Sequence, residues 1–538
     1  MESSLLDAVL APDASAPPAP GTSPSRLNGL SVRLRRLTDW RFGDPALIVG
    51  LLVISTLLRL RGIHFHYWID EGISVGIASH PLGMLHTLLR EDGAPPLWYA
   101  LLHIWMSIFG TTPAATHILS LIFAQLAIPA VWWAARPLGR AGATYAAILM
   151  AGVPYLTAYS EETRMYSLMV LLSVLVAGTF LRAFVLGRRR WIGPFILSLT
   201  AAMYTHNWGL FLAVACATGV LAAALLAPAA ERRPLLRDGV LALGACLVLY
   251  LPWLPTLLFQ AAHTGAPWAA HTVLWTWTQS LYFIAGGRDV AGVLFVAGIG
   301  GLVAAYRAAP REGIFRREVW VLVLLTWVTF GEGWLLGKVT YSFSARYAAA
   351  MIGPLVLIVA LALARSRRVA VIAVAVCCLW WVTNPEPTSL ATKSNVYSVS
   401  QVAGRYLNAD SLMLSTQPEQ VPTLHYYFPE ITHFGTPAGV PRYSYGVDWI
   451  NLLPRLESHY AHTELHRLLA GVRPGETVGL VVPLRLSTAT PYLKVINEYS
   501  QKWLKFLGND PNFTIVRVTQ QFSALAANPV ELAVYRRR

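Results

Sequence analysis

Long apolar runs, separated by short polar segments, fill the chain from about residue 46 to residue 384. Most approach the ~20 residues that a helix needs to cross a bilayer, although several are shorter. The pattern predicts a polytopic α-helical membrane protein with about 11 transmembrane helices. The predicted spans are residues 46–61, 113–135, 141–158, 164–186, 191–205, 207–228, 238–257, 289–306, 318–336, 347–364 and 368–383.

The composition supports this class of protein. Of the 538 residues, 55% are hydrophobic and only 13% are charged. Soluble domains carry about 25% charged residues. These values exclude an ordinary cytosolic enzyme and a disordered chain.

The formal net charge is +14, and its meaning depends on where the 42 Lys and Arg residues lie. With the N-terminus in the cytoplasm, the cytoplasmic segments before residue 384 hold 20 of these cations, whereas the outside loops hold five. This is the positive-inside bias of a plasma or inner membrane protein. The charge therefore orients the chain in the membrane and forms no surface for nucleic acid.

Two segments before residue 113 are not predicted to cross the membrane. Residues 1–45 are rich in Ala, Pro and Ser and then in Arg, so they predict a disordered basic cytoplasmic tail without a secretory signal. Residues 95–109 are apolar enough to span, but a span there would place every later basic loop outside. We therefore expect a juxtamembrane helix in the outer interface, where Trp and Tyr are enriched.

The composition changes after residue 384. Short β-like runs (SLMLST, TVGLVVPL, FTIVRVT and ELAVY) alternate with helix-like stretches. This alternation predicts an extracytoplasmic α/β domain over residues 385–538. Residues 46–384 would form the transmembrane domain, and we expect the catalytic groups in its first outer loop, residues 62–112.

That loop carries two acidic pairs. Asp70 and Glu71 follow an apolar aromatic run at the outer membrane face, and Glu91 and Asp92 precede a Pro-Pro pair. A carboxylate at a membrane boundary loses hydration, which raises its pKa and its basicity, as a general base for a sugar hydroxyl requires. The alternative is that Asp70 and Glu71 only cap the helix that follows them.

Further polar side chains stand near the ends of spans on the same outer side. An arginine there can bind a phosphate through two N–H groups, but it can equally pair with a carboxylate or extend to the interface. His206 has no second His or Cys at ligand spacing, so no metal site is predicted, and the sequence leaves a divalent cation open. The residues on this side are Glu161, Arg164, Tyr166, His206, Lys338 and Arg346.

The order of these motifs resembles that of the GT-C glycosyltransferases, most closely the protein O-mannosyltransferase and lipid A aminoarabinose transferase branches. The resemblance covers about residues 46–365 and includes an E-x-x-R-M-Y-S-L block. Where the relatives often have His or Lys before the Pro-Pro pair, this chain has Gly93 and Ala94. The matching residues are Asp70–Glu71, Glu91–Asp92 with Pro95–Tyr99, Glu161–Leu168, Thr205–Gly209 and Arg346–Tyr347.

The resemblance implies a GT-C fold, a polyprenyl-phosphate-sugar donor and an inverting transfer by single displacement. Asp70 would deprotonate the acceptor hydroxyl, and Glu71 is grouped with it as a catalytic residue. The residues that would position the acceptor or the sugar are Glu91, Asp92, Tyr99, Glu161 and Tyr166. Those that would bind the lipid phosphate are Arg346, Arg164, His206 and Lys338.

The C-terminal domain would help to select the acceptor. A Tyr-Ser-Tyr-Gly segment at 443–446 and the pair Asp448–Trp449 suit carbohydrate stacking. The alternative is a plain turn followed by a core tryptophan.

The predicted function is the transfer of a sugar to an extracytoplasmic glycan, glycolipid or protein. Mannose, arabinose, glucose and aminoarabinose are all compatible with the sequence, and the enzyme would be a hexosyl- or a pentosyltransferase of the cell wall. Mannose and arabinose are favoured, because the high Ala, Arg and Trp content suggests a GC-rich bacterial genome, where such donors are common. A multi-span transporter or lipid flippase is the alternative, and it predicts a polar midplane and related halves. A scaffold that binds cell-wall partners would leave the one-sided acids and cations unexplained.

Overall fold

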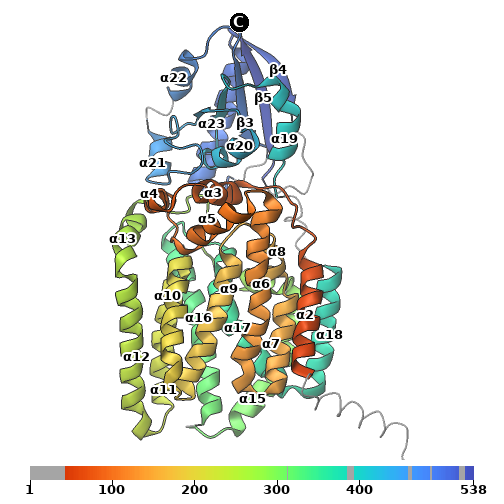
Figure 1. Ribbon diagram of the computed structural model, residues 1–538, viewed down its shortest axis with the longest axis vertical. Coiled ribbons are helices and arrows are strands. Elements are labelled where there is room, and N and C mark those ends of the chain that lie inside the picture. Colours follow the sequence, from red (N-terminus) through yellow and green to blue (C-terminus); the bar gives the residue numbers. More distant parts are fainter. Residues whose placement is uncertain (1–42, 312, 385–392, 459–462, 485–487, 520–527) are drawn as a thin grey trace, which may run out of the picture. The chain divides into compact units, whose positions relative to one another are not determined.

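The computed structural model describes residues 43–311, 313–384, 393–458, 463–484, 488–519 and 528–538 (Figure 1). Most of the predicted cytoplasmic tail (residues 1–42) and the start of the predicted C-terminal domain (385–392) lie outside these residues. Residues 51–538 form one compact unit. Its first residue, Leu51, lies within helix α2 (Gly43–Arg59).

Each predicted span corresponds to a helix or to a broken pair of helices. Within the described residues, seven helices are long and apolar enough to cross a membrane, or eight if the bent pair α7 and α8 is one span. The chain is therefore a multi-pass membrane protein. Helices α2, α10 and α18 have only 17, 14 and 17 residues, so the count of eleven spans stays a prediction. The helices after α2 are α6 (Pro113–Ala135), α7 (Arg140–Gly152), α8 (Pro154–Ser160), α9 (Tyr166–Phe180), α10 (Ile192–Thr205), α11 (Trp208–Leu225), α12 (Ala229–Tyr250), α15 (Arg288–Ala308), α16 (Ile314–Val339), α17 (Ala349–Arg365) and α18 (Arg367–Thr383).

The break between α7 and α8 has a local cause. Pro154 has no N–H to continue the helix, and its ring excludes the helical conformation at the residue before it. Val153 accordingly has φ −58° and ψ 123°, and the two helices meet at 48°. The chain after α8 then turns toward helix α3 (Ile69–Ala78), where it meets Glu71.

Helix α9 lies at the centre of the helical region. It packs against α6, α10 and α17, and 94% of its most apolar stretch is buried, against 17% for α15. A small residue permits the closest of these contacts, because a Cβ on Gly353 of α17 would lie 2.4 Å from the backbone nitrogen of Val174. The outer helices leave apolar side chains exposed, as lipid contact requires.

Short helices lie across one end of the bundle (Figure 1). They are α3, α4 (Leu82–Asp92) and α5 (Leu97–Phe109), and the first outer loop predicted from the sequence contains all three. The apolar segment predicted as a helix at 95–109 is α5, with 13 residues and buried Trp98 and Tyr99. Two further short helices connect α12 to α15, namely α13 (Leu254–His263) and α14 (Thr276–Ala285).

The C-terminal region contains a five-stranded sheet in the order β2-β1-β3-β5-β4. Strand β1 is parallel to β2 and β3, whereas β5 is antiparallel to β3 and β4. The four β-like runs are strands, as predicted, and β2 is an additional strand of three residues. The strands are β1 (Leu412–Ser415), β2 (His433–Gly435), β3 (Thr477–Pro483), β4 (Phe513–Thr519) and β5 (Val530–Arg537).

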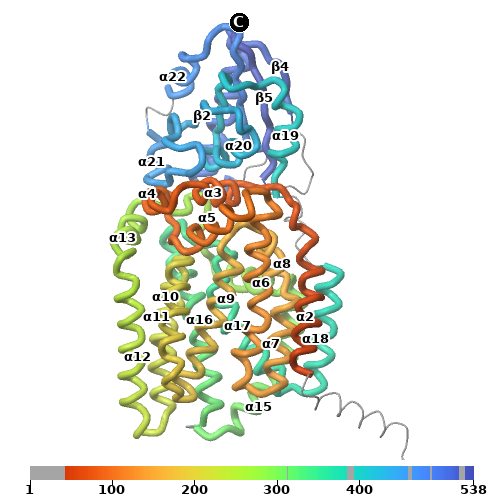
Figure 2. The backbone as a smooth tube through the Cα atoms, in the orientation of Figure 1, coloured from red at the N-terminus to blue at the C-terminus, as the bar shows by residue number. Residues whose placement is uncertain are grey.

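Helices cover both faces of this sheet. One core joins it to α19 (Val396–Ala403) and α20 (Val421–Tyr427). The other core joins it to α22 (Glu464–Ala470) and α23 (Pro491–Asn509). Helix α20 also packs against α3, although the two are far apart in the sequence (Figure 2).

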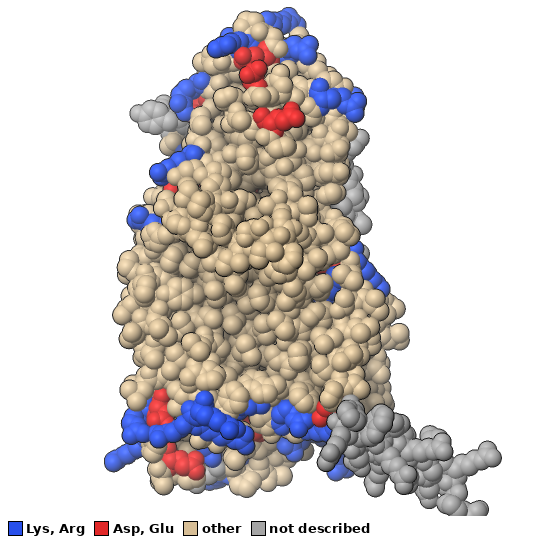
Figure 3. Space-filling model, viewed as in Figure 1, with Lys and Arg blue, Asp and Glu red and all other residues tan. Residues whose placement is uncertain are grey.

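Charged side chains are unevenly spread over the surface. In the face shown in Figure 3, basic side chains gather at the end of the helical region away from the sheet, and the wide zone between the two ends is almost free of charge. This is the distribution expected of a protein whose middle zone contacts lipid.

Candidate active site

Asp70 faces two arginines from distant parts of the chain. Its Oδ2 accepts a hydrogen bond from Arg346 Nη1 at 2.6 Å, and Arg164 Nη2 lies 4.0 Å from the same oxygen. The three side chains are only 13–16% exposed. Two guanidinium groups from distant parts of the chain thus converge on one carboxylate oxygen.

Helix α3 sets the position of Asp70. The N-cap of α3 is Trp68, which makes no side-chain cap bond, and Asp70 and Glu71 lie within the first turn. The interpretation of the acidic pair as helix caps is therefore wrong. Arg164 fixes this turn by donating from Nη1 to the Asp70 carbonyl at 3.3 Å and to Ser74 Oγ at 3.0 Å.

Glu71 is fully buried at the centre of a polar network. Its Oε1 accepts hydrogen bonds from His117 Nε2 at 2.6 Å and from the Thr163 N–H at 2.8 Å. Its Oε2 lies 3.5 Å from Lys393 Nζ, and Lys393 also donates to the Glu161 carbonyl. Burial favours the protonated carboxyl, but Lys393 and His117 outweigh burial and lower the pKa of Glu71. The network joins α3 to α6, to the segment after α8 and to the C-terminal region.

Aromatic rings surround the Arg346 guanidinium. Its Cζ lies 4.8 Å from the ring centroid of Trp268, 5.6 Å from that of Trp68 and 5.8 Å from that of Tyr347. The Tyr155 hydroxyl donates to the Arg346 carbonyl. Cation–π attraction and this hydrogen bond hold the cation in one place.

Several buried donors near Asp70 have no hydrogen-bond partner among the described residues. They are Arg346 Nε, Arg164 Nε, the Tyr166 hydroxyl and Trp68 Nε1. Buried polar groups are normally hydrogen-bonded, so these donors are available to the acceptor atoms of a ligand. Two guanidinium groups with free N–H donors suit the oxygens of a phosphate.

His206 lies beside this set, with its ring centroid 4.9 Å from that of Tyr347 and 6.0 Å from that of Tyr166. Its Nδ1 accepts a hydrogen bond from the Trp208 N–H at 3.1 Å. Burial, and then Arg164 and Arg346, lower the pKa of His206 to about 3. The ring is therefore neutral at physiological pH and offers an N–H without a charge.

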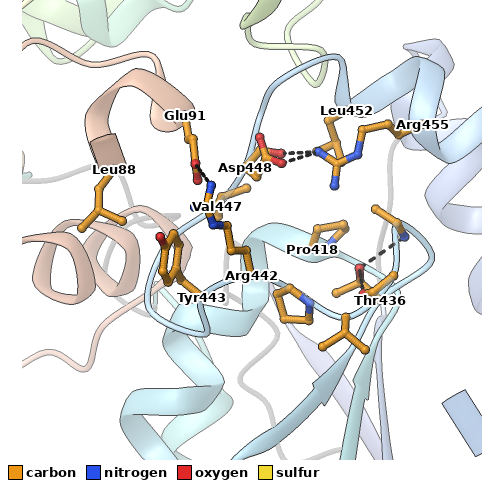
Figure 4. A pocket seen from close by; sticks show the side chains of 15 residues that line it. Leu88, Glu91, Pro418, Thr436, Arg442, Tyr443, Val447, Asp448, Leu452 and Arg455 are labelled. Carbon is orange, nitrogen blue, oxygen red and sulfur yellow. Dashed lines mark hydrogen bonds and ion pairs between the residues drawn. The ribbon is translucent and has the colours of Figure 1, made fainter. Parts of the chain in front are cut away.

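Helix α4 sends its two terminal acids in different directions. Asp92 accepts a hydrogen bond from the Tyr99 hydroxyl at 3.2 Å. Burial raises its pKa to about 6, although Arg164 opposes that rise. Glu91 instead reaches the C-terminal region, where its Oε1 accepts from Arg442 Nη1 at 3.2 Å. Asp92 thus interacts electrostatically with the Asp70 cluster, by which we mean Asp70, Arg164 and Arg346. Glu91 lines a separate pocket (Figure 4).

The other predicted residues have varied surroundings. Glu161 is buried, and its Oε1 accepts from the Gly62 N–H at 2.7 Å. Lys338 is exposed at the end of α16, with its Nζ 4.5 Å from the ring centroid of Trp334. The structure thus gathers Asp70, Arg164 and Arg346 in direct contact, and it places Lys338 in a different contact. Within the described part of the chain, no group of three or more His, Cys, Asp or Glu side chains could hold a metal ion.

Two residues of the network were not predicted. His117 is a lone histidine inside an apolar run, and a buried ionisable residue in such a run is itself a functional signal. Lys393 is the first cation after the last predicted span. Nothing in the sequence relates Lys393 to Glu71, which lies 322 positions earlier.

Solved structures with a similar fold include ArnT and an arabinofuranosyltransferase. ArnT from Cupriavidus metallidurans, bound to undecaprenyl phosphate, is 13% identical with a TM-score of 0.56, over 92% of this chain and 98% of that chain. Its apo structure is 12% identical with a TM-score of 0.55 over the same shares of the two chains. The arabinofuranosyltransferase AftD from Mycobacteria is 15% identical with a TM-score of 0.51, over 91% of this chain and 39% of that chain.

At these identities the likeness establishes the fold, which is the GT-C fold predicted from the sequence. No protein-family model and no curated protein sequence matches the chain.

Proposed function

We propose that this protein is a membrane glycosyltransferase that moves a sugar from a polyprenyl-phosphate donor to an acceptor hydroxyl. The observation that carries the proposal is the contact of Asp70 with Arg346 and Arg164, whose buried Nε atoms have no partner among the described residues. Two further facts support it. The fold is similar to that of ArnT, which was solved with bound undecaprenyl phosphate, and to that of a named arabinofuranosyltransferase.

The proposed reaction is a single displacement. Asp70 accepts the proton of the acceptor hydroxyl while the acceptor oxygen forms a bond to the anomeric carbon of the donor sugar. The bond between that carbon and the phosphate oxygen breaks, and the electron pair leaves with the polyprenyl phosphate. Arg346 and Arg164 stabilise the charge that develops on this phosphate. The configuration at the anomeric carbon is inverted.

The neighbouring residues take supporting roles in this proposal. Both carboxylate oxygens of Glu71 are engaged by His117, Thr163 and Lys393, so in this proposal Glu71 positions Asp70. Tyr166 and the neutral His206 donate hydrogen bonds to the phosphate or the sugar, and Asp92 with Tyr99 positions the acceptor. Glu161 holds the segment that carries Arg164. We give Lys338 no role in the phosphate site, because it is exposed beside Trp334.

The sugar and the acceptor are proposed from the sequence. Mannose and arabinose remain the favoured sugars, and a glycan, glycolipid or protein outside the cytoplasm is the acceptor. The basic end in Figure 3 would face the cytoplasm by the positive-inside rule. Residues 385–538 would then form an extracytoplasmic domain above the site. The alternative of a transporter or lipid flippase gains no support from the structures of similar fold.

The test is sugar transfer by purified protein with radiolabelled polyprenyl-phosphate sugars. Asp70→Asn should reduce transfer by about 10²–10⁴-fold, the usual contribution of a positioned base, while donor binding persists. Asp289→Asn is the matched control, because Asp289 is an exposed aspartate at the start of α15. Transfer at the wild-type rate by Asp70→Asn would refute the assignment.

A further inference from the structure

Two pockets adjoin each other on the C-terminal region. One has a volume of about 130 Å³ and lies between the end of α4 and the segment 436–455 (Figure 4). The other has a volume of about 420 Å³ and extends along β2 and α22. They share a common wall, residues 440–443. Pockets that bind small molecules commonly have volumes of about 300–1,000 Å³, so the pair is large enough for more than one sugar ring.

Ion pairs line the smaller pocket. Arg442 Nη1 lies 3.2 Å from Glu91 Oε1, and Arg455 Nη1 lies 2.7 Å from Asp448 Oδ2 (Figure 4). Each cation is matched by a carboxylate, so the pocket has no net charge from these four groups. The Arg442 side chain is 67% exposed, and a guanidinium has five N–H groups, so most of its donors remain available to a ligand. Paired ions of this kind offer donors and acceptors to hydroxyl groups.

Two rings of an aromatic stack, Tyr443 and Tyr445, line the larger pocket. The ring centroids of His80 and Tyr445 are 3.4 Å apart, and those of Tyr445 and Tyr443 are 5.1 Å apart, with interplanar angles of 29° and 27°. Tyr443 is the outer ring of this stack, and it lines both pockets. A rigid ring with a polar tip is suited to pack against the C–H face of a sugar.

The smaller pocket is adjacent in the chain to the Asp70 cluster. Glu91 lines the pocket, and the next residue, Asp92, interacts with Arg164 and Asp70. The Trp449 N–H donates to the Glu91 carbonyl at 3.1 Å, which fixes the pocket loop to the end of α4. The end of α4 therefore carries one residue that lines the pocket and one that interacts with the proposed active site.

We propose that these two pockets bind the neutral oligosaccharide part of the acceptor, with Tyr443 as the aromatic platform and the Arg442–Glu91 and Arg455–Asp448 pairs as hydroxyl ligands. This rests on the proposed transferase function. The matched charges argue for an uncharged glycan, since a phosphorylated headgroup would be expected to require unpaired cations. Trp449 is buried, so it does not stack on a sugar, whereas Tyr443 is partly exposed.

Binding of neutral tetrasaccharides of mannose and of arabinose to the full-length protein tests the site directly. Tyr443→Ala should weaken the affinity for the tetrasaccharide that binds by about tenfold, as expected for the loss of one aromatic contact. It should raise the KM for a glycan acceptor by the same factor. Transfer of the donor sugar to water should be unchanged, and Tyr443→Phe should resemble the wild type in every assay.

The outcomes separate this site from the proposed function. Binding of a tetrasaccharide without any sugar transfer would leave the site standing and remove the transferase. Sugar transfer by a wild-type protein that binds neither tetrasaccharide but binds a phosphorylated disaccharide would overturn the neutral-glycan site. A Tyr443→Ala protein that loses donor hydrolysis along with acceptor affinity would also overturn it, because the effect would then be on the whole fold.

Discussion

The buried pair of Glu71 and Lys393 should be essential for stability even though neither side chain is proposed to touch substrate. Glu71→Gln keeps the size of the side chain and removes its charge. Lys393, only 3% exposed, would then be a buried cation that has lost its ion pair with Glu71. Removing one partner of a buried pair costs about 3–5 kcal/mol. We therefore expect Glu71→Gln to lower the free energy of unfolding by that amount.

The double variant Glu71→Gln/Lys393→Met is the matched control. It removes both charges, and replacing a whole buried pair by uncharged groups is often close to neutral. The double variant should therefore recover at least about 2 kcal/mol relative to the sum of the single variants. Denaturant unfolding of the purified protein, followed by tryptophan fluorescence, gives all four free energies. Losses that simply add would refute the inferred coupling.

The pH dependence gives an independent check on the same pair. Because the pKa of Glu71 is lowered in the folded protein, its charge stabilises the fold above the ordinary carboxyl pKa. That contribution is lost as the pH falls through the lower pKa of the folded state. Glu71→Gln should flatten this acid limb of the stability curve, and an unchanged limb would show that other carboxyls cause it.

Two predictions concern the proposed reaction. Arg346→Ala should raise the KM for the donor far more than the KM for the acceptor. Arg346→Lys should be intermediate, because lysine keeps the charge and lacks the planar guanidinium group. Equal increases in KM for both substrates would count against a phosphate role. The pKa of Asp92 is raised to about 6, and its ionised form is the one that accepts hydrogen bonds from hydroxyl groups. Transfer should therefore increase as the pH rises through about 6, and Asp92→Asn should remove this limb from the kcat/KM profile.

The helical part of the fold could be predicted because burial in lipid demands long apolar runs. The count of basic loops identified α5 as a helix that does not span. The β-like runs after residue 384 identified the strands β1, β3, β4 and β5. Strand β2 was missed because three residues, His433–Gly435, show no alternation. Its pairing with β1 is a tertiary property.

The candidate site was predictable only to the level of a membrane face. The sequence placed Asp70, Arg164 and Arg346 on the same side of the membrane, and in the structure the two arginines contact Asp70. The same reasoning included Lys338, whose Nζ lies against Trp334. Residues on the same side of the membrane share a depth in the bilayer. Which of them are in contact depends on how the helices pack. Lys393 could not be predicted, because its contact with Glu71 depends on how the C-terminal region packs on α3.

The contact between Lys393 and Glu71 also has a consequence for biosynthesis. Helix α3 is made early, yet the lysine that neutralises Glu71 is made 322 residues later. At ~5–20 residues per second, the ribosome needs at least a quarter of a minute to cover that distance. Throughout this interval the helix that presents Asp70 lacks its final ionic contact. The site therefore matures only after the last membrane segment has been translated, which would keep a partly synthesised chain from acting on donor lipid.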